Sequence, residues 1–322
     1  MPQHQHRDTP APHRRPPDAA PLRIGHISDF HLPLPRSVPW HRLFSKRVLG
    51  LANLTWHRRH THALRPFERI LDALQQEAPD ITVITGDLVN LALDFEFDAV
   101  AARLRDAGFT RDNTLLVPGN HDRYTPFAHL RGDFEARLSD WFPPPPSTGK
   151  HPRYPLVRPL GPAVFIGLDT ATWRGPLRAA GVLRTSQLDA LHQALVGPFA
   201  DKHPVVALHH PPFALEGALG KQYRDGMAHG ERLLDILAGR NATVLHGHTH
   251  LRSFRRLGDT AVFGVPSTSS LHPDDRRTAA YHLYEVTAQG LRSATSVQYI
   301  PGAPAGADFR RIPWSPNDEA FA

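Results

Sequence analysis

The chain contains no cysteine, which excludes disulfide bonds and metal sites built from thiolates. It also lacks any run of about 18 apolar residues, so no membrane-spanning helix is expected. The first 21 residues hold no apolar segment of the kind that marks a signal peptide. Together these absences predict a soluble protein of a reducing compartment, and we expect a cytoplasmic location.

The composition fits a single α/β domain with loops and tails. Hydrophobic residues make up 40% of the 322 residues, enough for a proper core. Lys and Arg outnumber Asp and Glu by 37 to 31, a formal net charge of +6. This excess favours anionic partners such as phosphates, but ordinary solubility would explain it equally well. The 22 histidines are the stronger signal, because of where they lie.

Both ends of the chain are rich in residues that break regular structure. Residues 1–21 are rich in Pro, His, Arg and Ala and lack an apolar period, which predicts a disordered tail. Residues 301–322 have a similar composition and predict a C-terminal tail. One domain is therefore expected over 22–300, with 36–62 as a candidate lid insertion.

Six short apolar runs between the tails end in polar residues. They are rich in Val, Ile and Leu, as expected for strands buried on both faces. Helical patterns separate several of them, which predicts a largely parallel sheet covered by helices. After Asp259 the pattern changes to antiparallel strands, either closing the first sheet or forming a second. The helices are expected at 63–76, 96–107, 185–195, where Thr185 or Ser186 would be the N-cap, and 230–238.

The polar residues at the strand ends form a set suited to metal ions. Ligands bind beyond the carboxyl ends of parallel strands, so these residues should converge on one rim. Oxygen and nitrogen donors without sulfur suit Mn, Fe or Zn. Seven donors exceed what one ion would take while keeping an open position, whereas two ions that share a carboxylate would use all of them. The candidates are Asp29, His31, Asp87, Asn120, His209, His248 and His250.

Five sequence blocks contain these candidates. In chain order they are DFH at 29–31, GD at 86–87, GNHD at 119–122, HH at 209–210 and GHTH at 247–250. This series resembles the signature of the calcineurin-like metallophosphoesterases, and the resemblance covers about 22–250. It implies a four-layer α/β/β/α sandwich, in which two mixed sheets are flanked by helices.

The resemblance also implies how the candidates share two metal ions. Two sets of three would each hold one ion, and Asp87 would bridge both. The first set is Asp29, His31 and His250, and the second is Asn120, His209 and His248.

Three further residues receive roles from the same resemblance. His121 would assist the leaving group as hydrogen-bond donor or general acid, while hydroxide held between the ions attacks phosphorus. Asp122 would orient and polarise His121. His210 would either support the metal ligands or contact the substrate. By contrast, an ordinary structural role is expected for His26, His246 and Asp169, which belong to no block.

The nature of the phosphoester is less constrained. LHHPPF at 208–213 and the later GVPSTS and YHLYEV most resemble the class III cyclic-nucleotide phosphodiesterase branch. A phosphodiesterase acting on cyclic nucleotides or similar small phosphodiesters is therefore the first expectation. A homodimer is a candidate assembly.

The segment 36–62 suggests an alternative substrate. It interleaves Trp40, Trp56 and other apolar residues with Arg and Lys, a composition that can lie on a membrane surface or accept a lipid phosphate. This favours a phosphoesterase or pyrophosphatase of lipid-linked substrates as the second hypothesis, whereas a packed helix with a solvated basic face would be purely structural. A nuclease ranks lower because no long basic groove pattern is evident. A non-catalytic scaffold could lose ligands, but this chain has kept all of them.

Overall fold

The structure is a computed structural model, and it describes residues 20–32, 62–144, 154–173, 179–213, 227–304 and 306–314. Almost all of the predicted N-terminal tail and of the segment 36–62 lies outside the described residues. His62 is the exception at the end of that segment.

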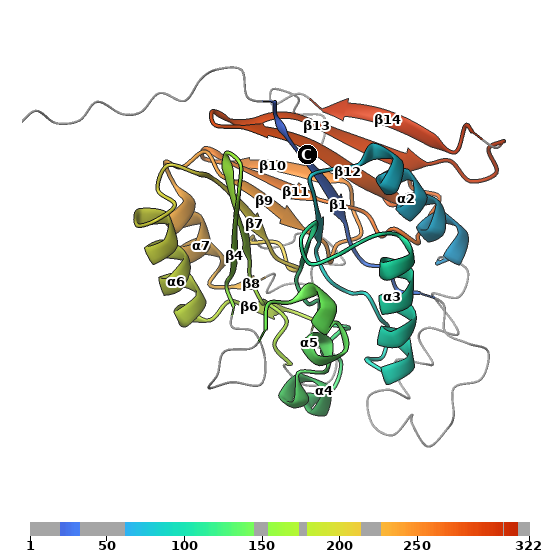
Figure 1. Ribbon diagram of the computed structural model, residues 1–322, viewed down its shortest axis with the longest axis horizontal. Helices are drawn as coiled ribbons and strands as arrows, with labels where there is room; N and C mark the ends of the chain where they lie inside the picture. Colours follow the sequence, from blue (N-terminus) through green and yellow to red (C-terminus); the bar gives the residue numbers. More distant parts are fainter. Residues whose placement is uncertain are drawn as a thin grey trace, which may run out of the picture.

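Two six-stranded mixed sheets form the centre of the molecule (Figure 1). The first has the order β14-β13-β12-β1-β2-β3, and the second β10-β11-β9-β7-β5-β4. The first consists of β1 (Leu22–Ile27), β2 (Ile81–Ile84), β3 (Thr114–Leu116), β12 (Ala280–Thr287), β13 (Gly290–Tyr299) and β14 (Phe309–Trp314). The second consists of β4 (Leu156–Leu160), β5 (Ala163–Gly167), β7 (His203–Ala207), β9 (Thr243–His246), β10 (Ser253–Leu257) and β11 (Thr260–Gly264). A small two-stranded sheet pairs β6 (Gly181–Val182) with β8 (Met227–Ala228).

Both sheets are mixed: the first has parallel strands at one end, and the second has parallel strands in its centre with an antiparallel strand at each edge. β1, β2 and β3 pair in parallel, and β12 pairs with β1 in the antiparallel direction. In the second sheet β5, β7, β9 and β11 are all parallel neighbours. The antiparallel prediction after Asp259 is therefore correct for β12 to β14 and holds only on one side of β11, which pairs antiparallel with β10 and parallel with β9.

The predicted helices are present with small shifts at their ends. α2 (Leu64–Glu77) buries Phe67, Ile70, Leu71 and Leu74 on one face, as its apolar period predicts. α3 (Asp94–Asp106), α6 (Thr185–Val196) and α7 (Gly230–Leu237) occupy the other expected positions. Short helices α4 (Pro126–Arg131) and α5 (Asp133–Arg137) and a 3-10 turn, Ser139–Trp141, follow β3.

The expected cap of α6 is wrong. Arg184 occupies the N-cap position of this helix, and no side chain caps it. Thr185 and Ser186 are already inside the first turn, because the helix starts one residue earlier than the Ser/Thr preference suggests.

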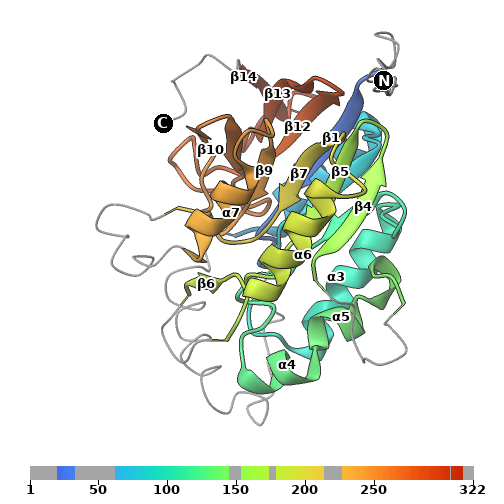
Figure 2. The ribbon, with the colours of Figure 1, turned by 90° about the vertical axis from the view of Figure 1, so that its left-hand side faces the viewer.

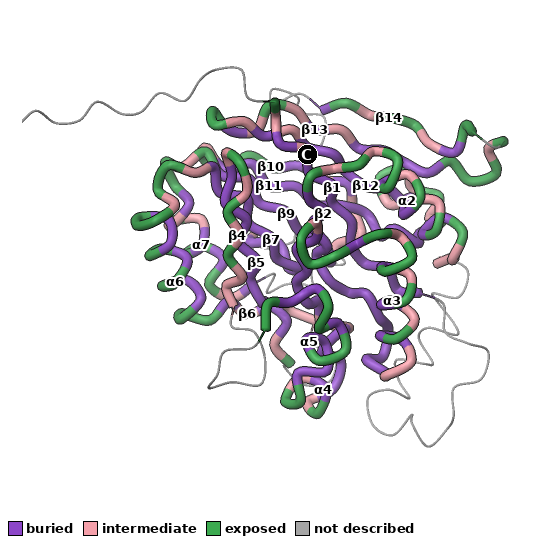
Figure 3. The backbone as a smooth tube through the Cα atoms, in the orientation of Figure 1, coloured by how far each residue is buried: buried purple, intermediate pink, exposed green. Residues whose placement is uncertain are grey.

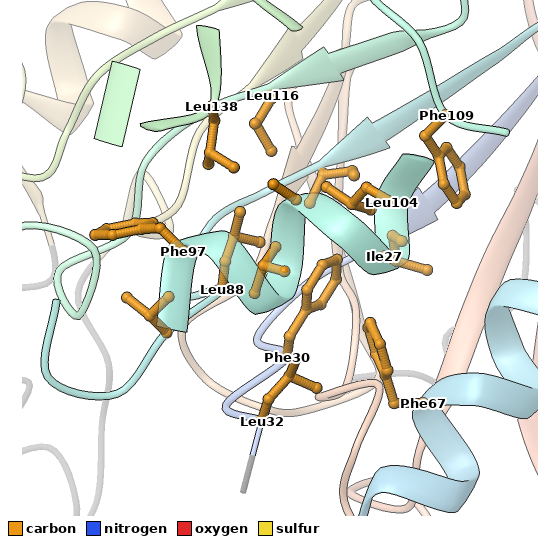
Figure 4. Packing of buried hydrophobic residues seen from close by; sticks show 14 of the residues in the cluster. Ile27, Phe30, Leu32, Phe67, Leu88, Phe97, Leu104, Phe109, Leu116 and Leu138 are labelled. Carbon is orange, nitrogen blue, oxygen red and sulfur yellow. The ribbon is translucent and has the colours of Figure 1, made fainter. Parts of the chain in front are cut away.

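The layers stack as helix, sheet, sheet, helix from α6 and α7 to α2 and α3 (Figure 1), which confirms the expected sandwich, and Figure 2 shows α6 and α7 lying over the second sheet. One apolar cluster joins α2 and α3 to the first sheet, and Figure 4 shows Phe30 and Phe67 packed within it, their ring centroids 4.9 Å apart. A second cluster fills the space between the sheets, and a third lies under α6 and α7. The central strands β2, β5, β7, β9 and β11 are consequently buried throughout, whereas the edge strands β4, β10 and β14 and the helices include exposed residues (Figure 3).

The C-terminal stretch differs from its prediction. Residues 309–314 form β14, which pairs with β13 along its whole length, so the predicted tail from 301 contains a strand of the first sheet. Within the described ranges, no helix is long and apolar enough to cross a membrane.

Candidate metal centre

The polar residues predicted from the strand ends do converge. Asp29 and His31 follow β1, Asp87 follows β2 and Asn120 follows β3, all in the first sheet. His209, which follows β7, comes from the second sheet, as do His248 and His250, which follow β9. Parallel strands of both sheets end at the same rim, and this brings the donors together.

The first group of donors consists of Asp29, His31 and His250. The Nε2 atoms of His31 and His250 lie 3.3 Å apart, and His250 Nε2 lies 3.1 Å from Asp29 Oδ1. His31 Nε2 is 3.9 Å from the same Asp29 oxygen. Three donors from two sheets thus surround one point.

The second group consists of Asn120, His209 and His248. Asn120 Oδ1 lies 3.1 Å from both His209 Nε2 and His248 Nδ1, and the two nitrogens are 3.3 Å apart. The Thr85 carbonyl holds the other nitrogen of His209 at 2.7 Å, which aims Nε2 into the group.

Asp87 lies between the two groups. Its Oδ2 is 3.6 Å from His31 Nε2 on one side and 3.3 Å from His209 Nε2 on the other. Its Oδ1 accepts a 2.7 Å hydrogen bond from the backbone amide of His121, which fixes the carboxylate in this orientation. The bridging position expected for Asp87 has this geometry.

The separations fit metal ligands better than hydrogen bonds. Donors bonded to one ion at about 2.1 Å lie about 3.0 Å apart at right angles and about 3.4 Å apart at the tetrahedral angle. Asp29 Oδ1 is buried and accepts no hydrogen bond within the described part of the chain, although His250 Nε2 is 3.1 Å away. The residues present therefore fit two metal ions that share Asp87.

The electrostatics of the site favour bound positive charge. Burial alone would raise the pKa of the Asp87 carboxyl, yet His209 and other neighbouring imidazoles hold it well below its ordinary value. Burial would lower the pKa of His209, but the Asp87 carboxylate raises it to about 9. The carboxylates thus stabilise a cation beside His209, and a metal ion would meet the same field.

The local backbone is strained at most of the donors. Asp29, His31, Asp87, His248 and His250 all have left-handed φ angles, between 41° and 67°. Non-glycine residues rarely adopt this conformation, and such strain concentrates at functional sites. It lets consecutive residues after a strand turn their side chains toward one point.

Two glycines allow the ligand loops to approach each other. Gly86 has a φ of 88°, and a Cβ atom there would collide with the backbone of Gly119. A Cβ atom on Gly119 would in turn collide with Asp87. The blocks GD and GNHD therefore need both glycines for close backbone contact.

His121 lies beside the donors. One of its ring nitrogens is within 4.8 Å of donor atoms of His31 and Asp87. Its Nδ1 is 2.8 Å from the Asn90 carbonyl oxygen, and its ring stacks on Tyr124 with centroids 5.4 Å apart. The Asn90 carbonyl accepts the Nδ1 proton, which leaves Nε2 to act on a bound molecule.

Asp122 is bound by backbone amides, whereas it was expected to orient His121. Its carboxylate is fully buried and accepts hydrogen bonds of 2.8 to 3.2 Å from four backbone amides. Burial and the Asp87 charge raise the pKa of Asp122 to about 8, while the amide donors favour the charged form. Asp122 therefore holds the two ligand loops together and leaves the orientation of His121 to Asn90. The four donors belong to Asp87, Leu88, Val89 and Gly119.

His210 supports the second group. Its ring is buried against His248, with centroids 4.5 Å apart. Its Nδ1 is 2.8 Å from the Thr170 hydroxyl, and its Nε2 is 2.7 Å from the Ala179 carbonyl. Both nitrogens are engaged, so of its two expected roles the geometry favours support of the ligands.

One feature of the site was not anticipated from the sequence. His62 lies next to the first group, its ring centroid 5.3 Å from that of His31. This residue lies in no block, and no pattern in the sequence indicated it.

Asp169 has a structural role, as expected. Its carboxylate accepts a 2.9 Å hydrogen bond from the amide of Ala171 and contacts Arg123 at 3.0 Å, and Arg123 also pairs with Glu135.

Comparisons with known proteins give the family. The model of the calcineurin-like phosphoesterases matches residues 22–252, more than half of the chain. A probable cyclic nucleotide phosphodiesterase of Rhodopseudomonas palustris is 31% identical over 48% of this chain and 53% of its own length. A glycerophosphodiester phosphodiesterase of Enterobacter lignolyticus is 29% identical over 60% of this chain and 64% of its own. The matches thus span about half to two thirds of these two relatives.

Solved structures agree on the fold. A dimetal phosphatase from Danio rerio superimposes with a TM-score of 0.55 at 14% identity, covering 92% of this chain and all of that one. A purple acid phosphatase from yellow lupin superimposes with a TM-score of 0.59 at 12% identity, and the match covers 93% of this chain and 55% of the phosphatase chain. At such identities the likeness concerns the fold alone. The family match and the converging donors lead to one conclusion: the chain belongs to the calcineurin-like phosphoesterase family.

Proposed function

We propose that this protein is a metal-dependent phosphodiesterase that hydrolyses cyclic nucleotides or similar small phosphodiesters. The observation that carries the proposal is the position of Asp87 Oδ2 between two donor groups, with His121 beside them. The names of the relatives support a diester rather than a monoester as substrate.

Two metal ions would be held by the two donor groups with Asp87 shared between them. The donors are four imidazoles, two carboxylates and one amide, a set that suits Mn, Fe or Zn. Such a pair, when bound, supplies Lewis-acid charge and an activated water for in-line attack on phosphorus.

The chain supplies the remaining chemistry. The Asn90 carbonyl accepts the Nδ1 proton of His121, so the ring gives a proton from Nε2 to the departing alkoxide in its imidazolium form, which carries a proton on both nitrogens. The hydrogen bond from the backbone amide of His121 to Asp87 Oδ1 couples the position of His121, the proposed general acid, to the shared carboxylate. Because Asp122 ties the loops of Asp87 and Gly119, the ligands and the acid keep a fixed spacing.

A substrate panel on Mn-loaded protein tests the proposal. It would span cyclic nucleotides, glycerophosphodiesters, bis(p-nitrophenyl) phosphate, nucleoside-diphosphate lipids and phosphomonoesters. We expect turnover of soluble diesters above that of monoesters. Metal-loaded protein without turnover of any phosphoester would overturn the proposal and favour a non-catalytic scaffold.

Two variants sharpen the assay. Asp87→Ala should lose metal and activity together, since one carboxylate serves both groups. His121→Ala should keep its metal content and lose most turnover of substrates with poor leaving groups, while activated aryl esters suffer less. A fully active Asp87→Ala enzyme would contradict the assignment.

A lipid-linked phosphoester is the second candidate. Phe127 and Leu130 on α4 are 72% and 78% exposed, and α4 begins shortly after the loop that carries His121. Such an apolar pair near the site could meet acyl chains or a membrane surface. The segment 36–62, on which peripheral membrane contact was predicted, lies outside the described residues apart from His62. A cytoplasmic location and a homodimer likewise remain predictions.

Deleting 36–60 separates the two candidates. A lipid-linked substrate predicts loss of activity on vesicle-borne diesters with soluble diesters still turned over. If the deletion left the turnover of both vesicle-borne and soluble diesters unchanged, the segment would have no role in substrate binding.

A further inference from the structure

We propose that His62 is a substrate-contacting residue, which donates a hydrogen bond from Nε2 to a phosphoryl oxygen held at the first metal group. This inference rests on the proposed function and adds to it a residue that lies outside the five sequence blocks. It is carried by the position of the ring and by the way Ser269 holds it.

The backbone brings His62 to the rim from a separate part of the chain. His62 forms an antiparallel bridge with Ser270, and the amide of Ala63 donates a 2.9 Å hydrogen bond to the Ser269 carbonyl. The same loop reaches the first metal group: the Ser267 hydroxyl donates a 2.6 Å hydrogen bond to the Asp29 carbonyl. His62 is thus fixed relative to a predicted metal ligand.

The ring lies against two ligands without being one itself. Its centroid is 5.3 Å from that of His31 and 5.8 Å from that of His250, with which it makes a 90° edge contact. Among the described residues, none of the groups of clustered metal-binding donors includes His62. An imidazole at this distance can reach a molecule that the first group binds.

Two hydroxyls lie behind the ring. Ser267 donates its proton to the Asp29 carbonyl, so its oxygen can only accept from Ser269, whose hydroxyl oxygen lies 3.2 Å away. The same Ser269 oxygen lies 2.7 Å from His62 Nδ1, and the Ser269 proton can go to either partner. When Ser269 donates to Nδ1, the neutral ring carries its proton on Nε2 and is a donor toward an anionic oxygen.

His62 and His121 then have different functions beside the metal groups. The His31 ring contacts both, with centroids 5.3 Å and 4.8 Å away. The Asn90 carbonyl requires a proton on His121 Nδ1, whereas the Ser269 hydroxyl can donate to His62 Nδ1 and so leave the proton of the neutral His62 ring on Nε2. We assign departure of the alkoxide to His121 and recognition of the phosphoryl oxygen to His62.

Two substitutions, each of which keeps a polar group at the position of a different ring nitrogen, test the contact. His62→Asn places an amide near Nδ1, so it can keep the Ser269 contact but loses the outer donor. His62→Gln reaches the position of Nε2 and should restore part of the donor function. His192→Asn, on the exposed face of α6, is the matched control.

The measurements are metal content, calorimetric binding of inorganic phosphate to Mn-loaded protein, and turnover of bis(p-nitrophenyl) phosphate. We expect His62→Asn to keep both metals and to bind phosphate about tenfold more weakly, the loss of one hydrogen bond to a charged group. His62→Gln should recover part of that affinity, and His192→Asn should match the wild type.

Each other outcome overturns the inference. Wild-type phosphate affinity in His62→Asn would show that the ring makes no contact, and lost metal would show that it serves the ligands instead. Phosphate binding does not need turnover, so an inactive wild type that still shows the His62 effect would contradict the proposed function alone.

Discussion

Asp122 stabilises the metal-ligand loops through four backbone hydrogen bonds, and this determines what its loss should do. In Asp122→Ala, four buried amides lose their acceptor, and each unsatisfied group costs about 1–3 kcal/mol. We expect the free energy of unfolding of the metal-free protein to fall by about 3 kcal/mol or more. Urea denaturation measures this change.

Asp98→Ala is the matched control for Asp122→Ala. The Asp98 side chain is exposed and contacts Arg137 only at 3.5 Å, so its loss should change stability by less than about 0.5 kcal/mol. If Asp122→Ala were as stable as the wild type but lost turnover of poor leaving groups, Asp122 would act on His121 after all.

At the scale of elements, β14 joins the two sheets at one end of the sandwich. Trp314 is buried, and its ring centroid lies 4.1 Å from Phe254 of β10 and 4.8 Å from Phe263 of β11. Trp314→Ala should lower the free energy of unfolding by about 3–5 kcal/mol, the range for removing a buried large aromatic. Thermal and urea unfolding would measure it.

Trp173 offers the comparison for Trp314, because its side chain is 37% exposed. Trp173→Ala should therefore be clearly milder. Equal losses in the two variants, or a Trp314→Ala protein with wild-type stability, would mean that β14 contributes little to holding the sheets together.

The elements with a strong local pattern were predictable from the sequence. The apolar period of α2 and the short Val/Ile/Leu runs of β1, β7 and β9 predicted both their type and their position. The metal donors followed from the same logic, because polar residues directly after buried strands must lie at the rim.

Contacts between residues far apart in the sequence could not be predicted in the same way. β1 pairs with β12, some 260 residues away, and no local pattern specifies that contact. β14 contains Pro313 and two arginines, so its sequence did not indicate a strand. The strand forms because it pairs with β13 and buries Trp314. Asp122 was assigned to its neighbour His121, whereas four amides from two loops compete for it. His62 depended on Ser269, more than 200 residues away.

At the scale of the whole molecule, several histidines are buried in the neutral form, and this makes stability depend on pH. Burial lowers the pKa of His203 from 6.5 to about 4, and that of His282 to about 3. Between pH 6.5 and 4 the unfolded chain therefore binds protons that the folded protein does not. The stability that these two groups contribute is highest above pH 6.5, is lost as the pH decreases through about 4 for His203 and about 3 for His282, and levels off below.

His203→Gln tests this pH dependence away from the metal groups. His203 Nε2 is 3.0 Å from the Thr243 hydroxyl, a contact that glutamine can keep. The lowered pKa of His203 contributes about 3 kcal/mol to the pH-dependent stability, because each unit of pKa difference is worth about 1.4 kcal/mol. The variant should lose less stability than the wild type between pH 6.5 and 4. A profile as steep as the wild type would contradict this, and the exposed His192→Gln should leave it unchanged.

Metal binding should stabilise the whole sandwich because the donors come from both sheets. Asp29, His31, Asp87 and Asn120 follow strands of the first sheet, whereas His209, His248 and His250 follow strands of the second. An ion that binds only the folded protein adds about 2.7 kcal/mol when its concentration is 100 times its Kd.

Chelation should consequently lower the Tm of the wild type by about 5 °C or more, and added Mn should restore it. Asp87→Ala is the control, because the shared carboxylate is missing and its Tm should respond little to Mn. The measurement is differential scanning calorimetry at fixed pH, with and without Mn. If Mn raised the Tm of Asp87→Ala as much as that of the wild type, the ion would bind elsewhere, and the two sheets would not be linked through this centre.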